Sequence, residues 1–544
     1  MMLEKVTTNI DALVVGAGPV GLTMAAELAR HGLTCRLIDK CAEPSDKSKA
    51  LVLWSRSLEM LDAMGTAAPF VEAGLRVHGA SIYSRGERLL RVSLQVESPF
   101  DYALMIPQSE TERLLAVHAS RCGIETERSV ELTTFAADAC GVTSTMRLAN
   151  GADEQVRSAW LMGCDGAHST VRHTLGINFT GEAELSDWLL ADVHIGGSLP
   201  TDEISIYFHR EGVLALFPIV GGRFRIIADL GTSQHASRPT DPSLADVQTI
   251  VDGRGPGGLV LRDPVWLAGF RINERKVADY RHGRVFLAGD AAHIHSPAGG
   301  QGMNTGMQDA FNLAWKLALV HHGNASDVLL DSYASERGKV GDQVLRNAGI
   351  MTKAATLRNP LAQGFRDGLY RLFGSLQVVQ HAISGTLTEL SINYRHSPIS
   401  GEHQRSPLAH FWGGRGGVAA GDRAPDAPLV NATSGQTLQL FDLLRGTRHV
   451  LLLLSGIEAE SGMRSLAEIQ AAACAQYPNL LSVYIVALRG TPGVTHFDSD
   501  LSLHNRYGAG LSALYLIRPD GYVGFRSQPA NGDALIAHLA KYLL

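Results

Sequence analysis

The sequence has few of the features that would assign a chain to a secreted, membrane-bound or metal-binding class. It contains six cysteines among 544 residues, with neither disulfide-type pairing nor metal-ligand spacing. The residues up to position 15 lack the apolar core of a secretory signal, and no apolar run reaches the roughly 20 residues that cross a bilayer. These absences predict a reduced, cytoplasmic setting and no metal site.

An excess of charge of either sign is absent as well. The 48 Lys and Arg residues nearly balance 54 Asp and Glu, which leaves a net charge of -6. This balance predicts affinity neither for nucleic acid nor for a membrane surface. With 45% hydrophobic and 19% charged residues, the composition is that of a globular chain long enough for two or three domains. We expect a monomer or a homodimer that acts on a small molecule.

The first chemical motif follows an apolar, strand-like run at residues 10–15. It is the turn GAGPVG, with Gly16, Gly18 and Gly21, after which a helical pattern leads to a second strand that ends at Asp39. Strand, tight turn, helix and acid are the context of dinucleotide binding, in which the glycines admit a pyrophosphate and the carboxylate accepts ribose hydroxyls. The alternative is a glycine-rich turn without a ligand. The motif does not distinguish NAD from FAD.

A second glycine-rich segment, residues 284–304, has the sequence RVFLAGDAAHIHSPAGGQGMN. Its apolar start ends at Gly289-Asp290, a loop with Pro297 follows, and a helix begins near Gly302. Glycines let backbone N–H groups approach a ligand, and a helix N-terminus carries about half a positive charge. The segment therefore suits a partly anionic ligand such as a pyrophosphate or a reduced flavin. Taken alone, it fits an ordinary α/β connection equally well.

Other regions supply the remaining organisation. An apolar strand at residues 159–162 ends at the CDG motif of residues 164–166, and residues 192–230 alternate like an antiparallel sheet. A one-residue slip would exchange the two faces of that sheet. One possible inner face carries Tyr207, His209, Leu214, Leu216, Phe217 and Arg225, and the other carries the alternate set. Residues 309–394 are helical, residues 396–420 resemble a linker, and a separate α/β unit follows.

Taken together and in this order, the GAGPVG, CDG and Gly289-Asp290 segments resemble the single-component FAD-dependent aromatic hydroxylases, the group of para-hydroxybenzoate hydroxylase and phenol hydroxylase. The larger, polyketide-tailoring type ends in a thioredoxin-like domain, which the tail resembles. The implied fold is α/β, with a Rossmann-like FAD-binding domain at residues 1–76, 104–187 and 265–395. A mainly antiparallel β-sheet substrate domain would occupy residues 77–103 and 188–264. A linker (396–420) and a thioredoxin-like domain without Cys-x-x-Cys (421–544) would complete the chain.

The resemblance also implies a role for particular residues. The glycines of the first turn would receive the FAD pyrophosphate, Asp39 the ribose, Asp165 both FAD and NAD(P)H pyrophosphates, and Asp290 the ribityl chain. Pro297 and the backbone at the start of the last helix would line the flavin ring. The candidate cofactor contacts are Gly16, Gly18, Gly21, Asp39, Lys40, Lys49, Gln108, Leu132, Asp165, Gly289, Asp290, Pro297, Gly302, Met303 and Asn304.

This sequence departs from the family pattern at three places. Lys49 stands where the family often has Arg, which weakens a bidentate phosphate contact. The substrate acid of phenol hydroxylase would fall near Leu51, so that role cannot be transferred. The tail has no Cys-x-x-Cys after Ser455, which argues against thiol–disulfide exchange.

The reaction implied by the resemblance uses NAD(P)H, with NADPH favoured, to reduce FAD. O2 then forms a flavin C4a-hydroperoxide that hydroxylates a phenolic or polycyclic aromatic substrate, for example a polyketide. Pro297, Gly302 and Met303 form the predicted flavin-ring loop. A phenol reacts best as its phenolate, which asks for a nearby base or acceptor. Candidates for binding or activating the substrate are Tyr207, His209, Arg225 and His295, although structural packing or a solvated surface position explains each of them better than catalysis does.

Three rival functions remain open at this point. The same scaffold supports Baeyer–Villiger insertion or epoxidation. A flavin-free NAD-dependent dehydrogenase would need only the first motif and would leave the Asp165 and Asp290 segments unexplained. A non-catalytic, flavin-binding interaction protein would use the tail as a binding module.

Overall fold

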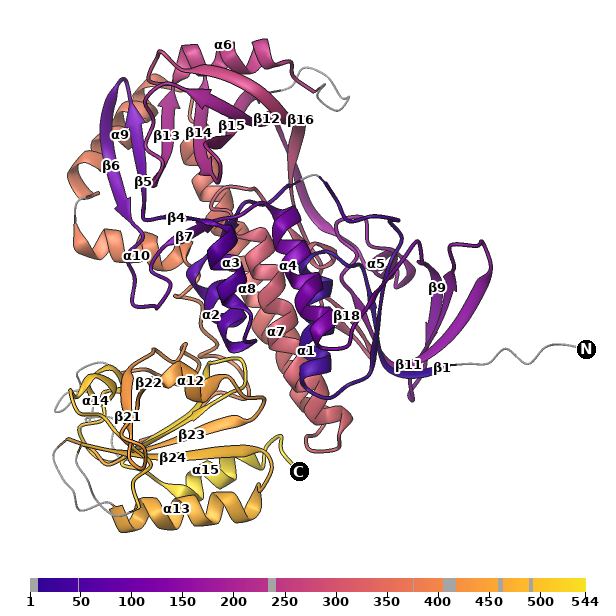
Figure 1. The fold of residues 1–544 in the computed structure, drawn as a ribbon, viewed down its shortest axis with the longest axis vertical. Coiled ribbons are helices and arrows are strands. Elements are labelled where there is room, and N and C mark those ends of the chain that lie inside the picture. The colour runs from indigo at the N-terminus through magenta and orange to yellow at the C-terminus, as the bar shows by residue number, and fades with distance from the viewer. Residues whose placement is uncertain are drawn as a thin grey trace, which may run out of the picture.

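The computed structural model describes residues 8–46, 48–232, 241–374, 376–404, 417–457, 463–488 and 493–544. Three eight-stranded sheets and one three-stranded sheet organise these residues. Figure 1 shows the second sheet at the top, the first sheet and its helices in the middle, and the C-terminal unit below them. The predicted α/β fold is confirmed.

The first sheet carries the glycine turn and has the strand order β17-β18-β11-β1-β2-β8. Its strands are β1 (Thr8–Val15), β2 (Cys35–Asp39), β8 (Thr126–Arg128), β11 (Asp153–Gly163), β17 (Arg281–His282) and β18 (Val285–Leu287). The hairpin β9 (Glu131–Ala137) and β10 (Val142–Arg147) is attached to β11. β1 is parallel to both β2 and β11, so the carboxyl ends of these strands meet at one edge, where α/β sheets bind ligands.

Helices on the first sheet connect these strands to the rest of the chain. They are α1 (Pro19–Arg30), α2 (Ser55–Ala63), α3 (Ala67–Ala73), α4 (Gln108–Arg121), α5 (Thr170–Thr174), η1 (Gly289–Ala291), α7 (Gly302–His321) and α8 (Val328–Ala355). Two further helices, α9 (Pro360–Phe373) and α10 (Gln377–Leu387), lie against the second sheet instead. A small sheet of β3 (Val52–Leu53), β7 (Ala103–Met105) and β4 (Leu75–Val77) joins them to the second sheet. α7 is buried along most of its length, and its buried residues include the polar side chains of Asp309, Asn312 and Lys316.

The second sheet has the order β19-β16-β12-β15-β14-β13-β5-β6. Its strands are β5 (Gly79–Ser84), β6 (Glu87–Ser93), β12 (Thr180–Gly196), β13 (Glu203–His209), β14 (Gly212–Ile219), β15 (Arg223–Thr232), β16 (Val260–Lys276) and β19 (His293–Ile294). β12 and β16 pair with each other from Thr180 opposite Lys276 to Gly196 opposite Val260. This pairing crosses the predicted borders at residues 188 and 264. The borders of the substrate domain drawn from sequence therefore cut through both strands.

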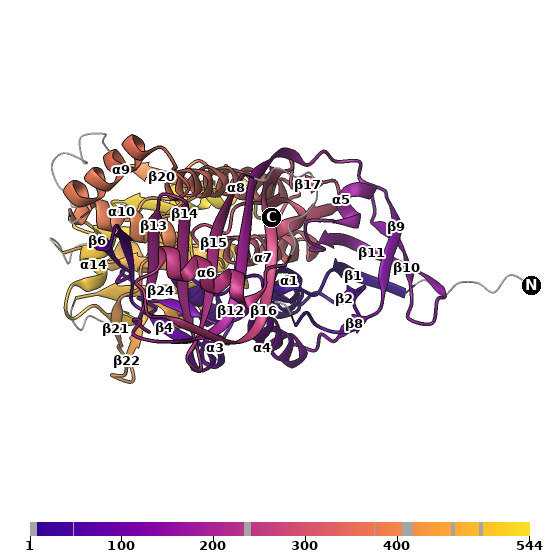
Figure 2. The same cartoon turned by 90° about the horizontal axis from the view of Figure 1, so that it is seen from above.

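Helix α6 (Leu244–Arg254) covers one face of the second sheet, as Figure 2 shows from above. Leu214, Leu216 and Phe224 pack there against Val247 and Val251 of α6. Because side chains alternate along a strand, the neighbouring residues of β14 and β15 point to the opposite face. That face approaches the first sheet, since Arg225 bonds the backbone of Lys49.

The C-terminal unit has the strand order β20-β27-β26-β23-β24-β25-β21-β22. Its elements are β20 (Gly401–Gln404), β21 (Pro428–Asn431), β22 (Thr437–Gln439), α12 (Leu440–Leu444), β23 (His449–Leu454), α13 (Met463–Gln476), β24 (Leu481–Ala487), β25 (His496–Phe497), α14 (Ser502–Tyr507), β26 (Ala513–Ile517), β27 (Val523–Gln528) and α15 (Gly532–Leu539). The parallel pair β23/β24 and the antiparallel pair β26/β27 form the thioredoxin-like core. β20 lies within the predicted linker, where it pairs with β27, and residues 405–416 lie outside the described part.

In the described ranges, no helix is both long enough and apolar enough to span a membrane.

Candidate functional site

The three glycines of the first turn have three different surroundings. Gly16 adopts φ +98°, and a Cβ there would lie 2.5 Å from the carbonyl oxygen of Cys164. A Cβ on Gly21 would lie 1.7 Å from the carbonyl oxygen of Gly16. A Cβ on Gly18 would meet nothing within 4 Å. The first and third glycines therefore allow the chain to turn and pack, and the second leaves open space where α1 begins.

Asp39 lies at the end of β2 beside this turn. Its carboxylate accepts hydrogen bonds from the backbone N–H of Ala17 at 2.7 Å and of Cys41 at 2.8 Å, and Arg128 lies 3.7 Å away. A carboxylate has about four lone-pair positions, so it can accept ribose hydroxyls in addition. The two neighbouring candidates differ, because Lys40 is exposed whereas Leu132 is buried in the core of the first sheet.

Asp165 follows β11 and lies against the glycine turn, where a Cβ on Gly16 would come within 2.9 Å of the Cα of Asp165. Its Oδ2 accepts a hydrogen bond from the N–H of Val171 at 3.1 Å, at the start of α5. Its Oδ1 is buried and lacks a partner in the described part of the chain. Burial raises the pKa of this carboxyl despite hydrogen bonds from the α5 region. An unpartnered acceptor at this edge is what a ligand donor would satisfy.

Gln108 is the first residue of α4, and it contacts the loop that carries Lys49. Gln108 Oε1 accepts from the N–H of Ala50 at 2.9 Å, its own N–H donates to Ser48 Oγ at 2.6 Å, and its Nε2 donates to Glu112 at 2.8 Å. The side chain of Gln108 therefore holds the loop in place. Lys49 is exposed.

Asp290 lies in η1, directly after β18. Its side chain is accessible to solvent, yet the protein around it excludes enough water to raise the pKa of its carboxyl, while His293 and Lys49 oppose that rise. Gly289 has φ +59°, and a Cβ there would lie 2.7 Å from Val20 in the first glycine turn. The two glycine-rich segments, far apart in sequence, are therefore in contact.

The loop before α7 is held by residues that donate to its carbonyl groups. Gly299 and Gly300 have φ +88° and +63°, and the N–H of Gly300 donates to the carbonyl of Pro297 at 2.9 Å, so the loop turns sharply. Trp54 Nε1 donates to the carbonyl of Gly299 at 2.9 Å. The buried side chain of Asn304 accepts from the N–H of Trp54 at 2.9 Å. Sequence patterns did not indicate either role, because each contact joins residues far apart in the chain.

Helix α7 starts at Gly302 and points its N-terminus into this region. The N–H of Thr305 donates to the carbonyl of Gln301 at 2.8 Å, so the N–H groups of Gly302, Met303 and Asn304 precede the helical hydrogen bonds. A Cβ on Gly302 would meet only the ring of His295, at 3.5 Å from Nε2. The helix start thus presents backbone donors to a neighbouring group.

His295 is held in one tautomer beside Gly302. Its Nδ1 lies 2.8 Å from the carbonyl of Ser296, which can only accept, so Nδ1 carries a proton. Burial, together with His293, lowers the pKa of His295 to about 4. The ring is therefore neutral near pH 7, and Nε2 is a buried acceptor that has no partner among the described residues.

The sheet residues considered for the substrate do not come together. Arg225 lies on the face toward the first sheet, where it forms a buried bidentate pair with Asp192 at 2.7 and 2.8 Å and donates to the carbonyl of Lys49 at 3.1 Å. Tyr207 pairs with Leu214 across β13 and β14 and therefore lies on the face covered by α6. His209 shares that face and accepts from the N–H of Glu211 at 3.3 Å.

Two family profiles match the chain. The FAD binding domain profile matches residues 9–348, and the profile described as aromatic-ring hydroxylase, C-terminal, matches residues 418–543. The chain is 33% identical to 6-methylpretetramide 4-monooxygenase of Streptomyces rimosus, over 98% of this chain and 94% of the relative. It is 32% identical to pentachlorophenol 4-monooxygenase of Sphingobium chlorophenolicum, over 99% and 97% of the two chains.

The fold is also similar to that of a solved relative. The anhydrotetracycline hydroxylase of Streptomyces rimosus superposes with a TM-score of 0.76 at 30% identity, and the match covers 98% of this chain and 99% of that one. Sequence and structure comparisons therefore agree along nearly the entire length, including the C-terminal unit.

Proposed function

Because this chain belongs to the family of FAD-dependent aromatic-ring hydroxylases, we propose that it uses NAD(P)H and O2 to hydroxylate a phenolic or polycyclic aromatic compound. The chain is an FAD-dependent monooxygenase of aromatic substrates, as its relatives are. One observation carries the assignment of its site. The glycine turn, Asp165, Asp290 and the start of α7 lie along one edge of the first sheet, linked by the contacts of Gly16 with Asp165 and of Gly289 with Val20.

The residues at this edge fit FAD on structural grounds as well. The open space beside Gly18 would let a pyrophosphate approach the N-terminus of α1 closely. The unpartnered Oδ1 of Asp165 could accept a hydrogen bond from the ligand. Asp39 would accept the ribose hydroxyls, and Asp290 those of the ribityl chain. When bound, FAD supplies the redox and oxygen chemistry of the reaction.

The chain itself supplies positioning, electrostatics and protection from water. The backbone donors at Gly302 and Met303, reinforced by the α7 dipole, stabilise negative charge that develops on a neighbouring group. The turn at Pro297 bounds the reacting space. Arg225 and Asp192 neutralise each other, so we assign them the task of holding the Lys49 backbone. His295 Nε2 is suited to accept a hydrogen bond from a phenol substrate or from a flavin ring bound beside Gly302.

We expect no separate binding site for the nicotinamide reductant. The sequence has no second dinucleotide motif, so we propose that the nicotinamide binds transiently over the FAD domain, and that NADPH is preferred to NADH. Comparing the kinetics of flavin reduction by the two nucleotides tests the preference. We also propose that the chain is divided into three domains, which limited proteolysis tests. We further propose that it is a monomer or a homodimer, which light scattering tests.

Relatives of this chain support two sizes of substrate. One acts on 6-methylpretetramide and another on pentachlorophenol, as their names state. On the face of the second sheet toward the first sheet, Phe217 packs with Val52 and Trp54 in an apolar cluster next to the loop before α7. An apolar wall of aromatic and aliphatic side chains suits a large ring system, and we therefore favour the polycyclic class.

The deciding experiment measures NAD(P)H oxidation by the purified, FAD-loaded protein with a panel of simple phenols and polycyclic aromatic polyketides. We expect polycyclic phenols to stimulate oxidation, and mass spectrometry with NMR to show a product with one added hydroxyl group. An ester or epoxide product would favour the Baeyer–Villiger or epoxidising alternative. Oxidation that no aromatic compound stimulates would refute the proposal.

A further inference from the structure

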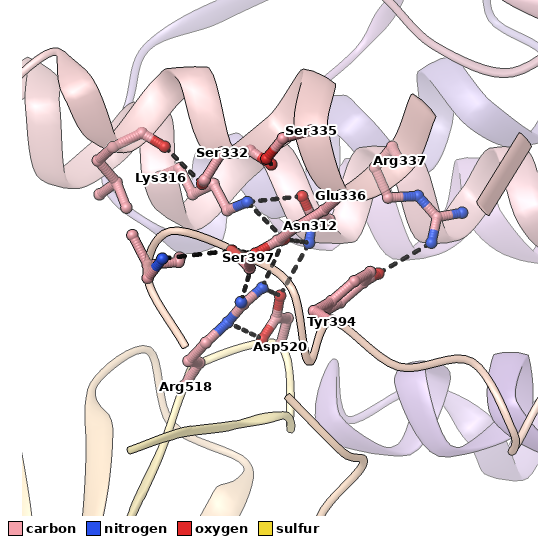
Figure 3. A network of polar contacts seen from close by, with 12 residues as sticks. Asn312, Lys316, Ser332, Ser335, Glu336, Arg337, Tyr394, Ser397, Arg518 and Asp520 are labelled. Carbon is pink, nitrogen blue, oxygen red and sulfur yellow. Dashed lines mark hydrogen bonds and ion pairs between the residues drawn. The ribbon is translucent and has the colours of Figure 1, made fainter. Parts of the chain in front are cut away.

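The turn that joins β26 to β27 inserts the buried side chain of Arg518 between the C-terminal unit and helices α7 and α8. Figure 3 shows Arg518 rising from the C-terminal unit to meet Glu336 on α8. Arg518 Nη1 and Nη2 donate to the two carboxylate oxygens of Glu336 at 2.7 and 2.9 Å. Arg518 Nε donates to Asp520 Oδ1 at 3.0 Å, so the guanidinium is held on two sides.

Glu336 collects further donors from two other segments. Lys316 Nζ and Asn312 Nδ2 of α7 each donate to its Oε2 at 2.7 Å, and Ser397 Oγ donates to its Oε1 at 2.6 Å. Burial alone would raise the pKa of Glu336, but Arg518 and Lys316 hold it well below its ordinary value. Two cations and two anions thus balance in a site closed to water. We call Asn312, Lys316, Glu336, Arg518 and Asp520 the interdomain clamp.

The clamp reaches three elements that hold the two segments assigned to FAD in the proposed function, on which this inference rests. These flavin-facing segments are the loop before α7 and the Gly289-Asp290 segment. The backbone carbonyl of Asp520 accepts from Arg56 of α2 at 2.6 Å. The carboxylate of Asp520 accepts from Asn312 of α7 at 3.1 Å, and Arg518 binds Glu336 of α8.

Each of these three elements holds a flavin-facing segment close to its clamp residue. Trp54, at the N-terminal end of α2, binds the carbonyl of Gly299. Asp309, one helical turn before Asn312, accepts from the N–H of Gly289 at 3.0 Å and lies 2.9 Å from His293 Nε2.

Arg337, the residue after Glu336, completes the connection on α8. Its Nε donates to Asp309 Oδ1 at 2.6 Å, and its Nη2 donates to the carbonyl of Thr305 at 2.9 Å in the first turns of α7. Its Nη1 donates to the hydroxyl of Tyr394 at 2.9 Å. Adjacent residues of one helix therefore bind the C-terminal unit and the flavin-facing segments.

We propose that the interdomain clamp is a positioning device through which the C-terminal unit sets the affinity of the protein for FAD. The clamp holds α2, α7 and α8 so that the loop before α7 and the Gly289-Asp290 segment keep their binding geometry before FAD arrives. A site that is ordered in advance binds its ligand more tightly, because no conformational entropy of the loops is lost on binding. The C-terminal unit thus has a task that needs no thiol chemistry.

The test measures the dissociation constant of FAD in full-length protein by fluorescence titration of the apoprotein. Arg518→Met removes the guanidinium, and Asp520→Asn keeps the shape of the turn but places an amide against the donors of Arg518 and Asn312. We expect the constant to rise at least tenfold in both variants. The stabilisation that FAD gives against thermal unfolding should shrink in parallel.

The matched control is Arg445→Ala, which removes another interdomain ion pair, between Arg445 of the C-terminal unit and Asp62, that is partly exposed to water. Its dissociation constant should stay within twofold of the wild-type value. A purely structural role predicts a different result, in which apo and FAD-bound proteins lose thermal stability equally and the constant is unchanged. That result in a folded variant, judged by near-ultraviolet circular dichroism, would overturn the proposal. Failure of both clamp variants to fold would also overturn it, in favour of a folding role.

Discussion

Replacing Gly18 by alanine should separate FAD binding from folding. The φ of Gly18 is -78°, which alanine adopts without strain, and the added Cβ would meet no protein atom within 4 Å. Alanine is a poorer helix N-cap than glycine, but it also reduces the entropy of the unfolded chain, and these effects of about 1 kcal/mol each nearly cancel. The apoprotein should therefore keep its stability.

The affinity for FAD should change much more. The new methyl group would occupy the open space that we assign to the pyrophosphate, and overpacking by one carbon typically costs about 1–3 kcal/mol. This cost corresponds to a rise in the dissociation constant of about 5- to 150-fold. Fluorescence titration of the apoprotein and thermal unfolding with and without FAD give the two quantities independently.

Two glycine variants frame the experiment. Gly21→Ala should impair folding itself, because its Cβ would come 1.7 Å from the carbonyl of Gly16. Gly364→Ala on α9 should leave FAD binding unchanged, since its Cβ would meet nothing within 4 Å. If Gly18→Ala bound FAD as tightly as wild type, the nucleotide would not cross this turn and the site assignment would fail.

Three other predictions concern buried polar groups. Burial lowers the pKa of His449 to about 3 and of His538 to about 4, so between pH 6.5 and 5.5 only the unfolded chain takes up these protons. Lowering the pH from 6.5 to 5.5 should therefore cost about 1 kcal/mol of unfolding free energy for each histidine. Urea titration should show this loss, and His449→Gln should reduce it by its share. Burial raises the pKa of Glu389 to about 8, so between pH 4.5 and 8 this carboxyl ionises in the unfolded chain but stays protonated in the folded chain. The free energy of unfolding therefore falls as the pH rises through this range. In the same titrations, Glu389→Gln should stabilise the protein by on the order of 3 kcal/mol at pH 7.5 but not at pH 4.5. Trp54→Phe removes the donor to Gly299, so FAD titration should show a loss of about fivefold in affinity, and an unchanged affinity would contradict the role given to this loop.

The elements that we assign to the cofactor could be picked out because their signals are local in sequence. A glycine turn between a strand and a helix, or a Gly-Asp pair before a glycine-rich loop, is recognisable within about twenty residues. The side chains that fix these segments are different. Trp54 and Asn304 are 250 residues apart in the chain, and neither has a pattern that indicates its partner. Pairing over such distances is decided by packing, which the local sequence does not record.

The faces of the second sheet illustrate the same limit. Alternation along β13–β15 predicted two sets of side chains without deciding which set faces the cofactor. The decision rests with α6, whose Val247 and Val251 cover the face that carries Leu214 and Tyr207. Arg225 is consequently left on the face toward Lys49. The helix that decides this orientation lies beyond the strands in the sequence, where the alternation of the strands gives no information about it.

The buried ion pairs of the clamp raise the question of why apolar side chains do not join the two parts. Buried charges gain little net stability, because losing water costs about as much as their attraction returns. What a bidentate pair does provide is direction, since a guanidinium and a carboxylate match in one plane. Arg518 and Glu336 therefore fix an orientation of α8 that an apolar contact would leave adjustable. Because the residue after Glu336 organises the Gly289 segment through Asp309, that orientation is transmitted to the cofactor site.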